Sequence, residues 1–263
     1  MLRRSRIFLL LSAVIIIISM SAPCYSADSF RKTFYKSLSA RLGKHRADYP
    51  NLSDSDFANF RMVNTSGIAP GKLFRSSSPI STWGSRNAIA DSESRKAGIS
   101  TFINLADSDE GMKQHKGYSG SYYSTRKIIG LNLRMKYKSP DFRRRLARGI
   151  RFMAANEPPY LVHCSLGKDR AGFVCAVIEC LAGSSWPEVE RDYMASFRNY
   201  FGILPGTREY DFVVKNEIAR FIAENFGIDN PAGANLYESA ERYIRGLGVS
   251  QQDIDTLRRK LGG

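Results

Sequence analysis

Residues 159–182 read PYLVHCSLGKDRAGFVCAVIECLA, and this stretch decides the expected fold. The short apolar run PYLV predicts a buried strand that ends at His163. The longer apolar run FVCAVIECLA predicts a helix that begins in the loop near Arg170 and ends at Gly183. Between them, HCSLGKDRAG at 163–172 brings a thiol, a lysine, an aspartate and an arginine into one loop. The stretch therefore predicts a strand, a chemically rich loop and a helix in succession.

The rest of the chain alternates between strand and helix patterns. Three more strands are expected, at GKLFRSS (71–77), ISTFINLA (99–106) and IIGLNLRM (128–135). Helices are expected at DFRRRLARGIRFMAAN (141–156), PEVERDYMASF (187–197), EYDFVVKNEIARFIAENF (209–226) and in two short segments near the C-terminus. Strands that interleave with helices predict an α/β fold with a largely parallel central sheet of four to five strands flanked by helices.

The N-terminus is typical of an export signal. Three arginines within the first six residues precede an apolar stretch at 7–20, which is too short to span a bilayer comfortably. Small residues follow, so we expect cleavage near Ser26 or Ala27 and an exported protein, either periplasmic or secreted. The alternatives are an uncleaved membrane anchor and, less favoured because Pro23 precedes it, a lipoprotein modified at Cys24.

The expected domain organisation follows from these patterns. With 263 residues and 43% hydrophobic content, the chain can bury a full core. We expect a signal peptide (1–27), an N-terminal lead segment (28–50), one main domain (51–228) and a small C-terminal helical extension (229–263). The extension begins at DNPAGAN, whose proline and glycine predict a hinge. Nothing in the sequence indicates an oligomeric state.

The chain is strongly basic. Its formal net charge of +14 falls to +11 once the three signal arginines are removed. Such a charge favours anionic partners, namely nucleic acid, a membrane surface or a phosphorylated substrate. Nucleic acid is not expected, because no basic motif is interleaved with aromatic residues and export argues against it. The arginines at 143–145 and the cations at 134–138 predict a basic mouth for an anionic lipid or inositol phosphate, or simply a solvated helix face.

The loop at 163–172 suits an anion. Backbone N–H groups can converge in a turn between a strand and a helix, and the helix dipole adds positive character. Cys164 at the base of such a cradle is a prepared nucleophile. Arg170, six positions later, can offer two parallel donors to a phosphate. The alternative is a core cysteine followed by a solvated turn. Cys175 and Cys180, in the apolar helix, are expected to be buried small hydrophobes.

HCSLGKDRAG closely resembles the HCxxGKDRTG signature of bacterial cysteine-dependent protein-tyrosine and lipid phosphatases. The resemblance covers roughly residues 51 to 261 and includes further segments: NFRMV (59–63), GKLFRSSSPIS (71–81), GISTFINLA (98–106), SSWPEVERDYMAS (184–196) and LYESAERYIRGLGVSQQDIDTLRRKL (236–261). It implies a cysteine-phosphatase-like fold and hydrolysis of phosphate monoesters without a metal or other cofactor.

The resemblance also implies roles for the loop residues. Cys164 is the nucleophile and Arg170 a phosphate ligand. The loop that binds phosphate comprises Ser165, Leu166, Gly167, Lys168 and Ala171. In such families a loop lysine accompanies activity on phosphoinositides as well as phosphotyrosine, although Lys168 can also be an ordinary solvated lysine.

Two positions depart from the family pattern. Ala171 stands where the family usually has a threonine, whose hydroxyl can stabilise the departing cysteine thiolate. Hydrolysis of the phosphocysteine should therefore be slower, unless Ser165 or water substitutes. The second departure is the general acid, because the region about thirty residues before the cysteine reads GLNLRMKYK and contains no carboxylate.

Four aspartates are candidates for the acid. Asp169 comes first, because related enzymes with GKDR loops use that aspartate, but helix capping explains it equally well. Asp141 comes second, although its SPDF context is typical of a helix start. Asp107 and Asp109 follow a predicted strand and are expected at the outer rim. Trp-Pro-Glu at 186–188 fits a capping box that begins at Ser185, so it is read as structural.

The sequence therefore predicts a phosphatase that acts through a cysteinyl-phosphate intermediate. The expected substrates are phosphotyrosine in a phosphorylated protein, with phosphoinositides or inositol phosphates close behind. The competing interpretation is a catalytically impaired module that binds phosphate or phosphoinositides, since Ala171 and the missing upstream acid are typical of a decayed enzyme. A redox thiol protein is not supported, because Cys164 has no partner at Cys-x-x-Cys spacing.

Overall fold

The computed structural model describes residues 27–262. The chain divides into two units, one that ends at Arg41 and one that begins at Leu42, and each is described by itself. In the first unit the described part is a single helix, α1 (Ala27–Arg41). The predicted signal peptide lies outside the described residues except for its last position.

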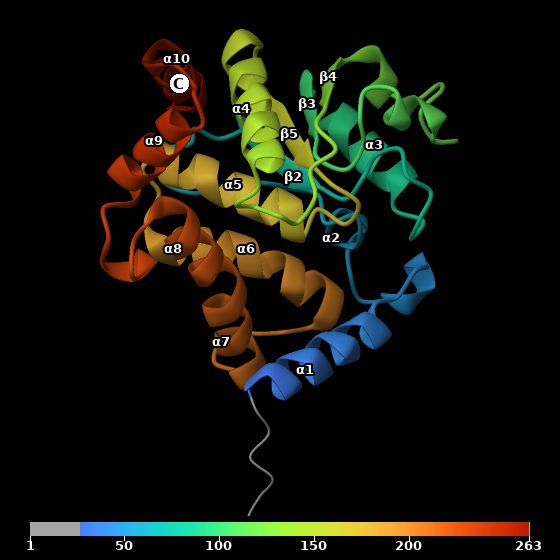
Figure 1. The fold of residues 1–263 in the computed structure, drawn as a ribbon. Coiled ribbons are helices and arrows are strands. Elements are labelled where there is room, and N and C mark those ends of the chain that lie inside the picture. The colour runs from blue at the N-terminus through green and yellow to red at the C-terminus, as the bar shows by residue number, and fades with distance from the viewer. Residues whose placement is uncertain (1–26, 263) are drawn as a thin grey trace, which may run out of the picture. The chain divides into compact units, whose positions relative to one another are not determined.

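The second unit is built on one sheet. In the described chain the sheet has five strands, in the order β1-β2-β5-β3-β4 (Figure 1). β1 is antiparallel to β2, and every other neighbouring pair is parallel, so the predicted largely parallel α/β sheet is confirmed. The strands are β1 (Arg61–Met62), β2 (Leu73–Ser76), β3 (Thr101–Asn104), β4 (Lys127–Gly130) and β5 (Tyr160–His163).

Strand β5 occupies the middle of the sheet. It pairs with β2 on one side and β3 on the other, so Leu161 lies opposite both Phe74 and Phe102. All four residues of β5 are buried, as expected for a strand covered on both faces. Cys164 follows directly, and it therefore begins at the carboxyl edge of the central strand.

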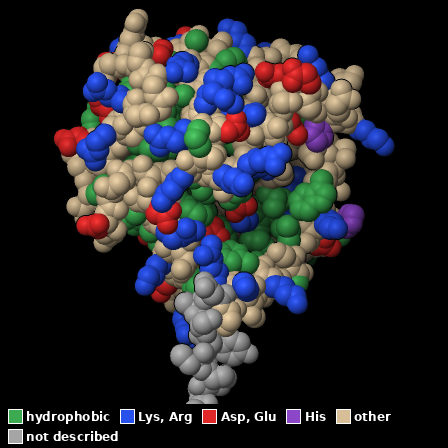
Figure 2. All heavy atoms as spheres, viewed as in Figure 1, with side chains coloured by type: hydrophobic (Ala, Val, Ile, Leu, Met, Phe, Trp, Pro, Cys, Tyr) green, Lys and Arg blue, Asp and Glu red, His purple; other side chains and the backbone are tan. Residues whose placement is uncertain are grey.

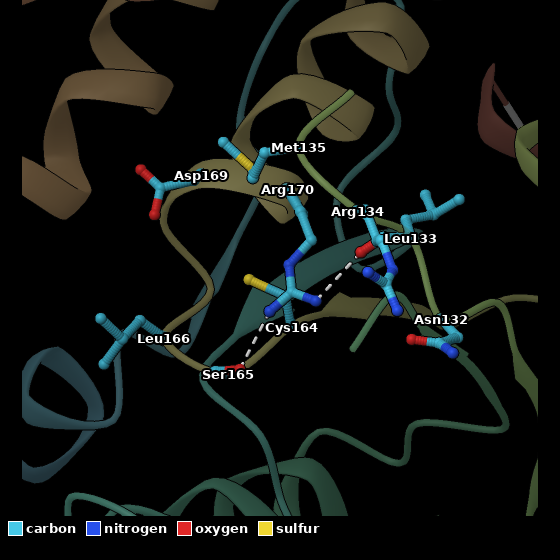
Figure 3. A pocket seen from close by; sticks show the side chains of 9 residues that line it. All are labelled: Asn132, Leu133, Arg134, Met135, Cys164, Ser165, Leu166, Asp169 and Arg170. Atoms are coloured by element: carbon cyan, nitrogen blue, oxygen red, sulfur yellow. Dashed lines mark hydrogen bonds between the residues drawn. The ribbon is translucent and has the colours of Figure 1, made fainter. Parts of the chain in front are cut away.

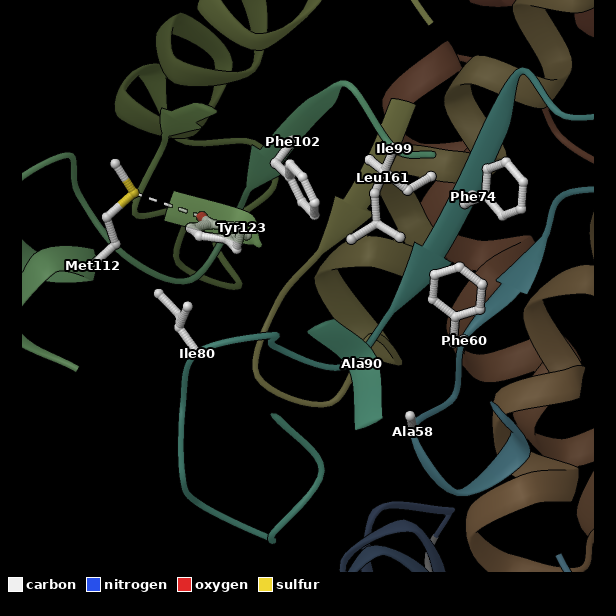
Figure 4. Close-up of a cluster of buried hydrophobic side chains, with 10 residues drawn as sticks. All are labelled: Ala58, Phe60, Phe74, Ile80, Ala90, Ile99, Phe102, Met112, Tyr123 and Leu161. Atoms are coloured by element: carbon white, nitrogen blue, oxygen red, sulfur yellow. Dashed lines mark hydrogen bonds between the residues drawn. The ribbon is translucent and has the colours of Figure 1, made fainter. Parts of the chain in front are cut away.

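One face of the sheet packs against α3 (Asn87–Lys96). Figure 4 shows the apolar side chains that fill this layer, which come from the strands, from α3 and from the loops around them. The cluster consists of Ala58, Phe60, Phe74, Ile80, Ala90, Ile99, Phe102, Met112, Tyr123 and Leu161. This packing holds β2, β3 and β5 together beneath the loop that carries the cysteine.

The other face packs against α4 (Pro140–Ala155) and α5 (Asp169–Ala182). Helix α4 approaches closely at Gly149, where a Cβ atom would lie 2.7 Å from the side chain of Leu131. Helix α5 is apolar on almost every side and is buried along most of its length, which is the pattern of a core helix. It ends at Gly183 in the left-handed conformation, as predicted.

Most of the remaining helices pack on α5. The helix expected at 209–226 is α7, a π-helical turn η4 and α8 in succession. Helix α9 packs on α5, and α10 packs on α4 and α5. These helices are α2 (Asp54–Phe57), α6 (Trp186–Phe201), α7 (Arg208–Val214), η4 (Lys215–Ala219), α8 (Arg220–Phe226), α9 (Leu236–Gly246) and α10 (Gln251–Gly262). Short 3-10 turns are η1 (Arg46–Asp48), η2 (Gly111–Gln114), η3 (Tyr123–Thr125) and η5 (Pro231–Gly233), the last within the predicted hinge.

Two details of the predicted elements are refined. The strand expected at 128–135 ends at Gly130, because the chain leaves the sheet and Asn132 adopts a positive φ of 42°. The capping box at the start of α6 is confirmed, since Glu188 accepts from both the N–H and the hydroxyl of Ser185. Among the helices of residues 27–262, none combines the length and the apolar character needed to cross a membrane.

Candidate active site

In the loop after β5, the carbonyl groups of Ser165 and Leu166 are hydrogen-bonded to residues outside the loop. The carbonyl oxygen of Ser165 accepts from the N–H of Ser78 at 3.2 Å. The carbonyl oxygen of Leu166 accepts from the Asn59 side-chain amide at 3.1 Å and from the Tyr200 hydroxyl at 2.6 Å. Because a trans peptide places its N–H opposite its carbonyl, the amide that follows each of these carbonyls faces the other side of the loop.

The next two carbonyls are held by a single arginine. Nη2 of Arg75, on β2, donates to the carbonyl oxygens of Gly167 at 2.8 Å and Lys168 at 3.1 Å. Within the described chain, the N–H groups of residues 165–170 donate to no protein acceptor. A row of such unpaired N–H groups at the start of a helix forms an anion-binding nest. The predicted phosphate cradle is therefore present in the geometry of the backbone.

Gly167 is required by this loop for two reasons. Its φ is +69°, a conformation that side chains rarely adopt. A Cβ atom at this position would also lie 2.2 Å from the carbonyl oxygen of Ser76, at the end of β2. The loop can therefore pass close over the sheet only with glycine at residue 167.

Arg75 belongs to a buried ionic network beneath the loop. Its Nη1 donates to Oδ2 of Asp192 at 2.5 Å, while Nε of Arg61 donates to Oδ1 of the same carboxylate at 3.0 Å. Burial opposes the ionised carboxylate, but the two arginines outweigh it and hold the pKa of Asp192 below its ordinary value. Burial and the charge of Asp192 raise the pKa of nearby Glu179 well above its ordinary value. The raised pKa disfavours a second negative charge beside Arg61, Arg75 and Asp192.

Arg170 reaches back over the loop from the first turn of α5. Its Nη1 donates to the carbonyl oxygens of Leu105 at 3.3 Å and Leu133 at 3.2 Å, and its Nη2 donates to Oγ of Ser165 at 3.0 Å. Figure 3 shows this guanidinium beside the sulfur of Cys164. Nε of Arg170 donates to no residue in the described chain, so part of its donor set is available to a ligand.

Cys164 lies at the base of a cavity of about 420 Å³. The residue is only 3% exposed, but its sulfur takes part in the cavity lining rather than packing into the core (Figure 3). The cavity is lined by Asn132, Leu133, Arg134, Met135, Cys164, Ser165, Leu166, Asp169 and Arg170. It therefore joins five of the predicted site residues to the segment 132–135, which follows β4.

Lys168 and Asp169 form an ion pair at the start of α5. The ammonium group of Lys168 also lies 4.5 Å from the centre of the Phe197 ring. Burial lowers the pKa of Lys168, but the carboxylates of Asp169 and Glu217 outweigh it, so the net shift is upward. The Lys168 side chain is only 12% exposed and is absent from the cavity lining, so it is not a solvated turn lysine. Asp169 does line the cavity.

Asp141 is placed in the first turn of α4 and not in the cavity lining. It accepts from Nη2 of Arg144 at 2.6 Å and from Nε of Arg145 at 2.8 Å. The hydrogen bond from Arg145, with the charges of both arginines, lowers the pKa of Asp141. These contacts match the helix-start interpretation of this residue.

Asp107 and Asp109 are also absent from the cavity lining. Oδ1 of Asp107 contacts Nε2 of His115 at 3.0 Å, and Oδ1 of Asp109 accepts from the N–H of Gly130 at 2.6 Å. Both carboxylates organise the loop after β3. Of the four predicted candidates for the general acid, Asp169 is the one that the structure brings together with Cys164.

The other residues of the loop region have structural surroundings. His163 is fully buried, its Nε2 lies 3.3 Å from the Tyr123 hydroxyl, and burial lowers its pKa to about 4. Cys175 and Cys180 are buried in α5, and burial raises the pKa of both thiols. Ala171 is fully buried and supplies no hydroxyl.

Sequence reasoning missed most of the outer wall and the support beneath the loop. Asn132, Leu133 and Met135 reach the cavity because the chain leaves the sheet after Gly130. For the arginines at 143–145 and the cations at 134–138, the sequence favours a solvated helix face over a basic mouth, and among them only Arg134 lines the cavity. Among the charged side chains on the face shown in Figure 2, Lys and Arg predominate over Asp and Glu.

The chain is similar to several known proteins. A family model described as "Tyrosine phosphatase family" matches residues 55–263. A tyrosine-protein phosphatase from Nostoc commune is 29% identical over 127 residues, which is 43% of this chain and 42% of that protein. The chain thus matches less than half the length of this relative. The solved core catalytic domain of the PP-IP phosphatase SIW14 from S. cerevisiae, in complex with citrate, is 20% identical with a TM-score of 0.38, over 64% of this chain and 92% of that chain.

Proposed function

The chain belongs to the tyrosine phosphatase family, and on that premise we propose that it hydrolyses phosphate monoesters through a phosphocysteine at Cys164. The observation that carries this proposal is the arrangement of the loop after β5. The carbonyls of four consecutive residues, from Ser165 to Lys168, form hydrogen bonds with residues outside the loop. The sulfur of Cys164 lies in the cavity with Arg170. Such a nest stabilises the charge that develops on a transferring phosphoryl group.

The first step transfers the phosphoryl group to sulfur. The oxygens of the bound phosphate accept from the loop N–H groups and from Arg170, which orients phosphorus above Cys164. The thiolate of Cys164 attacks phosphorus, and the bond between phosphorus and the leaving oxygen breaks. Asp169, in its protonated form and released from the ion pair with Lys168, gives its proton to that oxygen, so the product leaves as an alcohol or phenol.

The second step returns the enzyme to its starting state. A water molecule attacks the phosphorus of the phosphocysteine, and the carboxylate of Asp169 takes its proton. The bond between sulfur and phosphorus breaks, Cys164 leaves as a thiolate, and inorganic phosphate is released. Ala171 offers no hydroxyl to that thiolate, so this step is expected to be the slower one.

The proposed substrates are phosphotyrosine in a phosphorylated protein and, second, phosphoinositides or inositol phosphates. The family supports the first, and the basic surface supports the second. The proposal includes export, which rests on the basic and apolar N-terminal sequence. It also allows contact with an anionic membrane surface, which rests on the net charge.

The nucleophile is tested with p-nitrophenyl phosphate. The wild-type protein and Cys180→Ala are expected to hydrolyse it, whereas Cys164→Ser is expected to lose activity. Ala171 favours a second candidate, a module that binds phosphate without turnover. That candidate gains support if all three proteins bind inorganic phosphate but none hydrolyses the ester above background.

The general acid is tested with two leaving groups. Asp169→Asn should release the first equivalent of p-nitrophenol almost as fast as wild type, because p-nitrophenolate leaves without a proton, but its first step on phenyl phosphate should be slow. Steady-state turnover of both esters should fall, because Asp169 also takes the proton of water in the second step. Asp141→Asn serves as the matched control and should behave as wild type on both. If Asp169→Asn slows the first step equally on both esters, the acid assignment is wrong.

A further inference from the structure

The wall formed by residues 132–135 is fixed at the point nearest the cradle. The N–H of Leu133 donates to the carbonyl oxygen of Leu105 at 2.8 Å, and its carbonyl accepts from Nη1 of Arg170 at 3.2 Å. Arg134 therefore directly follows a residue whose N–H and carbonyl are both hydrogen-bonded; the bond from Arg170 to this carbonyl is drawn in Figure 3. A side chain mounted on a fixed backbone loses less conformational freedom when it binds a ligand.

No described carboxylate forms an ion pair with Arg134, although the charge of Arg134 acts at longer range on Asp141 and helps to lower its pKa. The three aspartates of the surrounding loops all have other partners: Asp141 binds two arginines of α4, Asp107 binds His115, and Asp109 binds a backbone amide. Arg134 makes no ion pair or side-chain hydrogen bond in the described part of the chain, and it is exposed toward the cavity that it lines.

The proposed reaction assigns no role to Arg134, although this residue lines the cavity. Arg170 and the loop amides serve the phosphate that is cleaved, and Asp169 is paired with Lys168. Arg134 lies on the segment after β4, so it reaches the cavity from the wall and not from the cradle. A guanidinium in this position can bind a further anionic group with two parallel hydrogen bonds.

We propose that Arg134 binds a second phosphate of the substrate, on the leaving group next to the phosphate that is cleaved. The preferred substrate class is then a small bis-phosphorylated ester with neighbouring phosphates. This inference rests on the proposed function and adds a specificity-determining residue to it. The side-chain amide of Asn132, which lines the same wall, can donate to the same group.

The test compares phenyl phosphate with 1,2-phenylene bis(phosphate), which differ by one neighbouring phosphate. Arg134→Met should lower kcat/KM for the bis-phosphate about 10- to 100-fold, the range expected for a lost hydrogen-bonded charge pair. For phenyl phosphate kcat/KM should change little. The matched control is Lys136→Met, which removes a nearby exposed cation that does not line the cavity.

The outcomes separate the two proposals. If wild type hydrolyses neither ester, the proposed function fails. If Arg134→Met lowers kcat/KM equally for both esters, Arg134 acts on the cleaved phosphate and the second-phosphate site is wrong. If Lys136→Met lowers bis-phosphate turnover as much as Arg134→Met, the effect is general attraction, which also overturns the site.

Two further substrates distinguish a lipid headgroup from a free phosphorylated polyol as the source of the second phosphate. They are a soluble glycerophosphoinositol bisphosphate and vesicles that contain the corresponding lipid. If Arg134→Met lowers kcat/KM on both substrates, the result supports recognition of the headgroup itself. A loss on the soluble headgroup alone also supports the site and points to a free phosphorylated polyol. A loss confined to vesicles and shared with Lys136→Met overturns the site, because it would report surface attraction.

Discussion

The buried guanidinium of Arg75 donates to the carbonyl oxygen of Gly167 over 2.8 Å, and this bond joins β2 to the underside of the phosphate cradle. The same guanidinium binds Asp192, which lies on α6. Arg75→Met removes a donor from Gly167 and from Lys168 and leaves Asp192 with one arginine. We expect a loss of about 3–5 kcal/mol in the free energy of unfolding, because a buried carboxylate loses one of its two arginine partners and two carbonyls lose a donor. Urea unfolding measures it.

A second readout separates the cradle from overall stability. Under conditions where Arg75→Met is still folded, its affinity for inorganic vanadate should also fall, because the loop amides are no longer held inward. The control is Arg144→Met, which removes an exposed arginine from α4. Vanadate affinity equal to wild type in folded Arg75→Met would refute the positioning role.

Gly167→Ala should abolish activity, whereas Gly120→Ala should not. Both glycines have a similar positive φ, but a Cβ atom at residue 167 meets the carbonyl oxygen of Ser76, and at residue 120 it meets nothing within 4 Å. Gly120→Ala therefore carries only the conformational cost, about 1–2 kcal/mol. Initial rates and urea unfolding of both variants give the comparison. Equal losses of activity would mean that close passage over β2 is not what residue 167 provides.

His163 should make the protein less stable in weak acid. Burial lowers its pKa from 6.5 to about 4, so between these values the unfolded chain binds a proton that the folded protein does not. Its contribution to stability is therefore present above about pH 6.5 and is lost as the pH falls toward 4, by up to about 3 kcal/mol. Urea unfolding of wild type at about pH 7.5 and 5 measures the loss.

The matched variant for this experiment is His163→Gln. Glu179 titrates with the opposite sign, because burial raises its pKa and its contribution is lost as the pH rises. The quantity to compare is therefore the change in the free energy of unfolding between the two pH values. Subtracting the change of the variant from that of wild type cancels the contribution of Glu179. An identical pH dependence in both proteins would remove His163 from the explanation.

Ala171→Ser should speed the breakdown of the phosphocysteine. A hydroxyl at this position can hydrogen-bond to the departing thiolate of Cys164, and a bond to a charged group corresponds to about a tenfold change in rate. The wild type is expected to release p-nitrophenol in a burst before steady turnover, and the variant should show a smaller burst and a higher kcat. A wild type without a burst would mean that breakdown is not the slow step.

The strand, loop and helix around Cys164 could be predicted because local patterns determine them. A short apolar run, a glycine and an apolar helix follow one another in that stretch, and the structure has β5, the loop and α5 there. The capping box at Ser185 was equally local, since its two partners are three residues apart.

The support of the loop could not be predicted because its partners are distant in sequence. Arg75 and Gly167 are 92 residues apart, and Asn59 reaches Leu166 across 107 residues. The two-residue strand β1 is too short to show a periodic pattern. The wall at 132–135 was read as strand because its apolar residues continue the pattern of β4, although the chain turns away after Gly130.

The central claim is that Cys164 carries the phosphoryl group during turnover, and trapping that group tests it most directly. Wild-type protein is mixed with p-nitrophenyl phosphate, denatured rapidly at steady state and analysed by mass spectrometry of the peptide that contains residue 164. We predict one phosphoryl group on Cys164 in wild type and in Cys180→Ala, and none in Cys164→Ser. Undiminished hydrolysis by Cys164→Ser, or a phosphoryl group on another residue, would contradict the account.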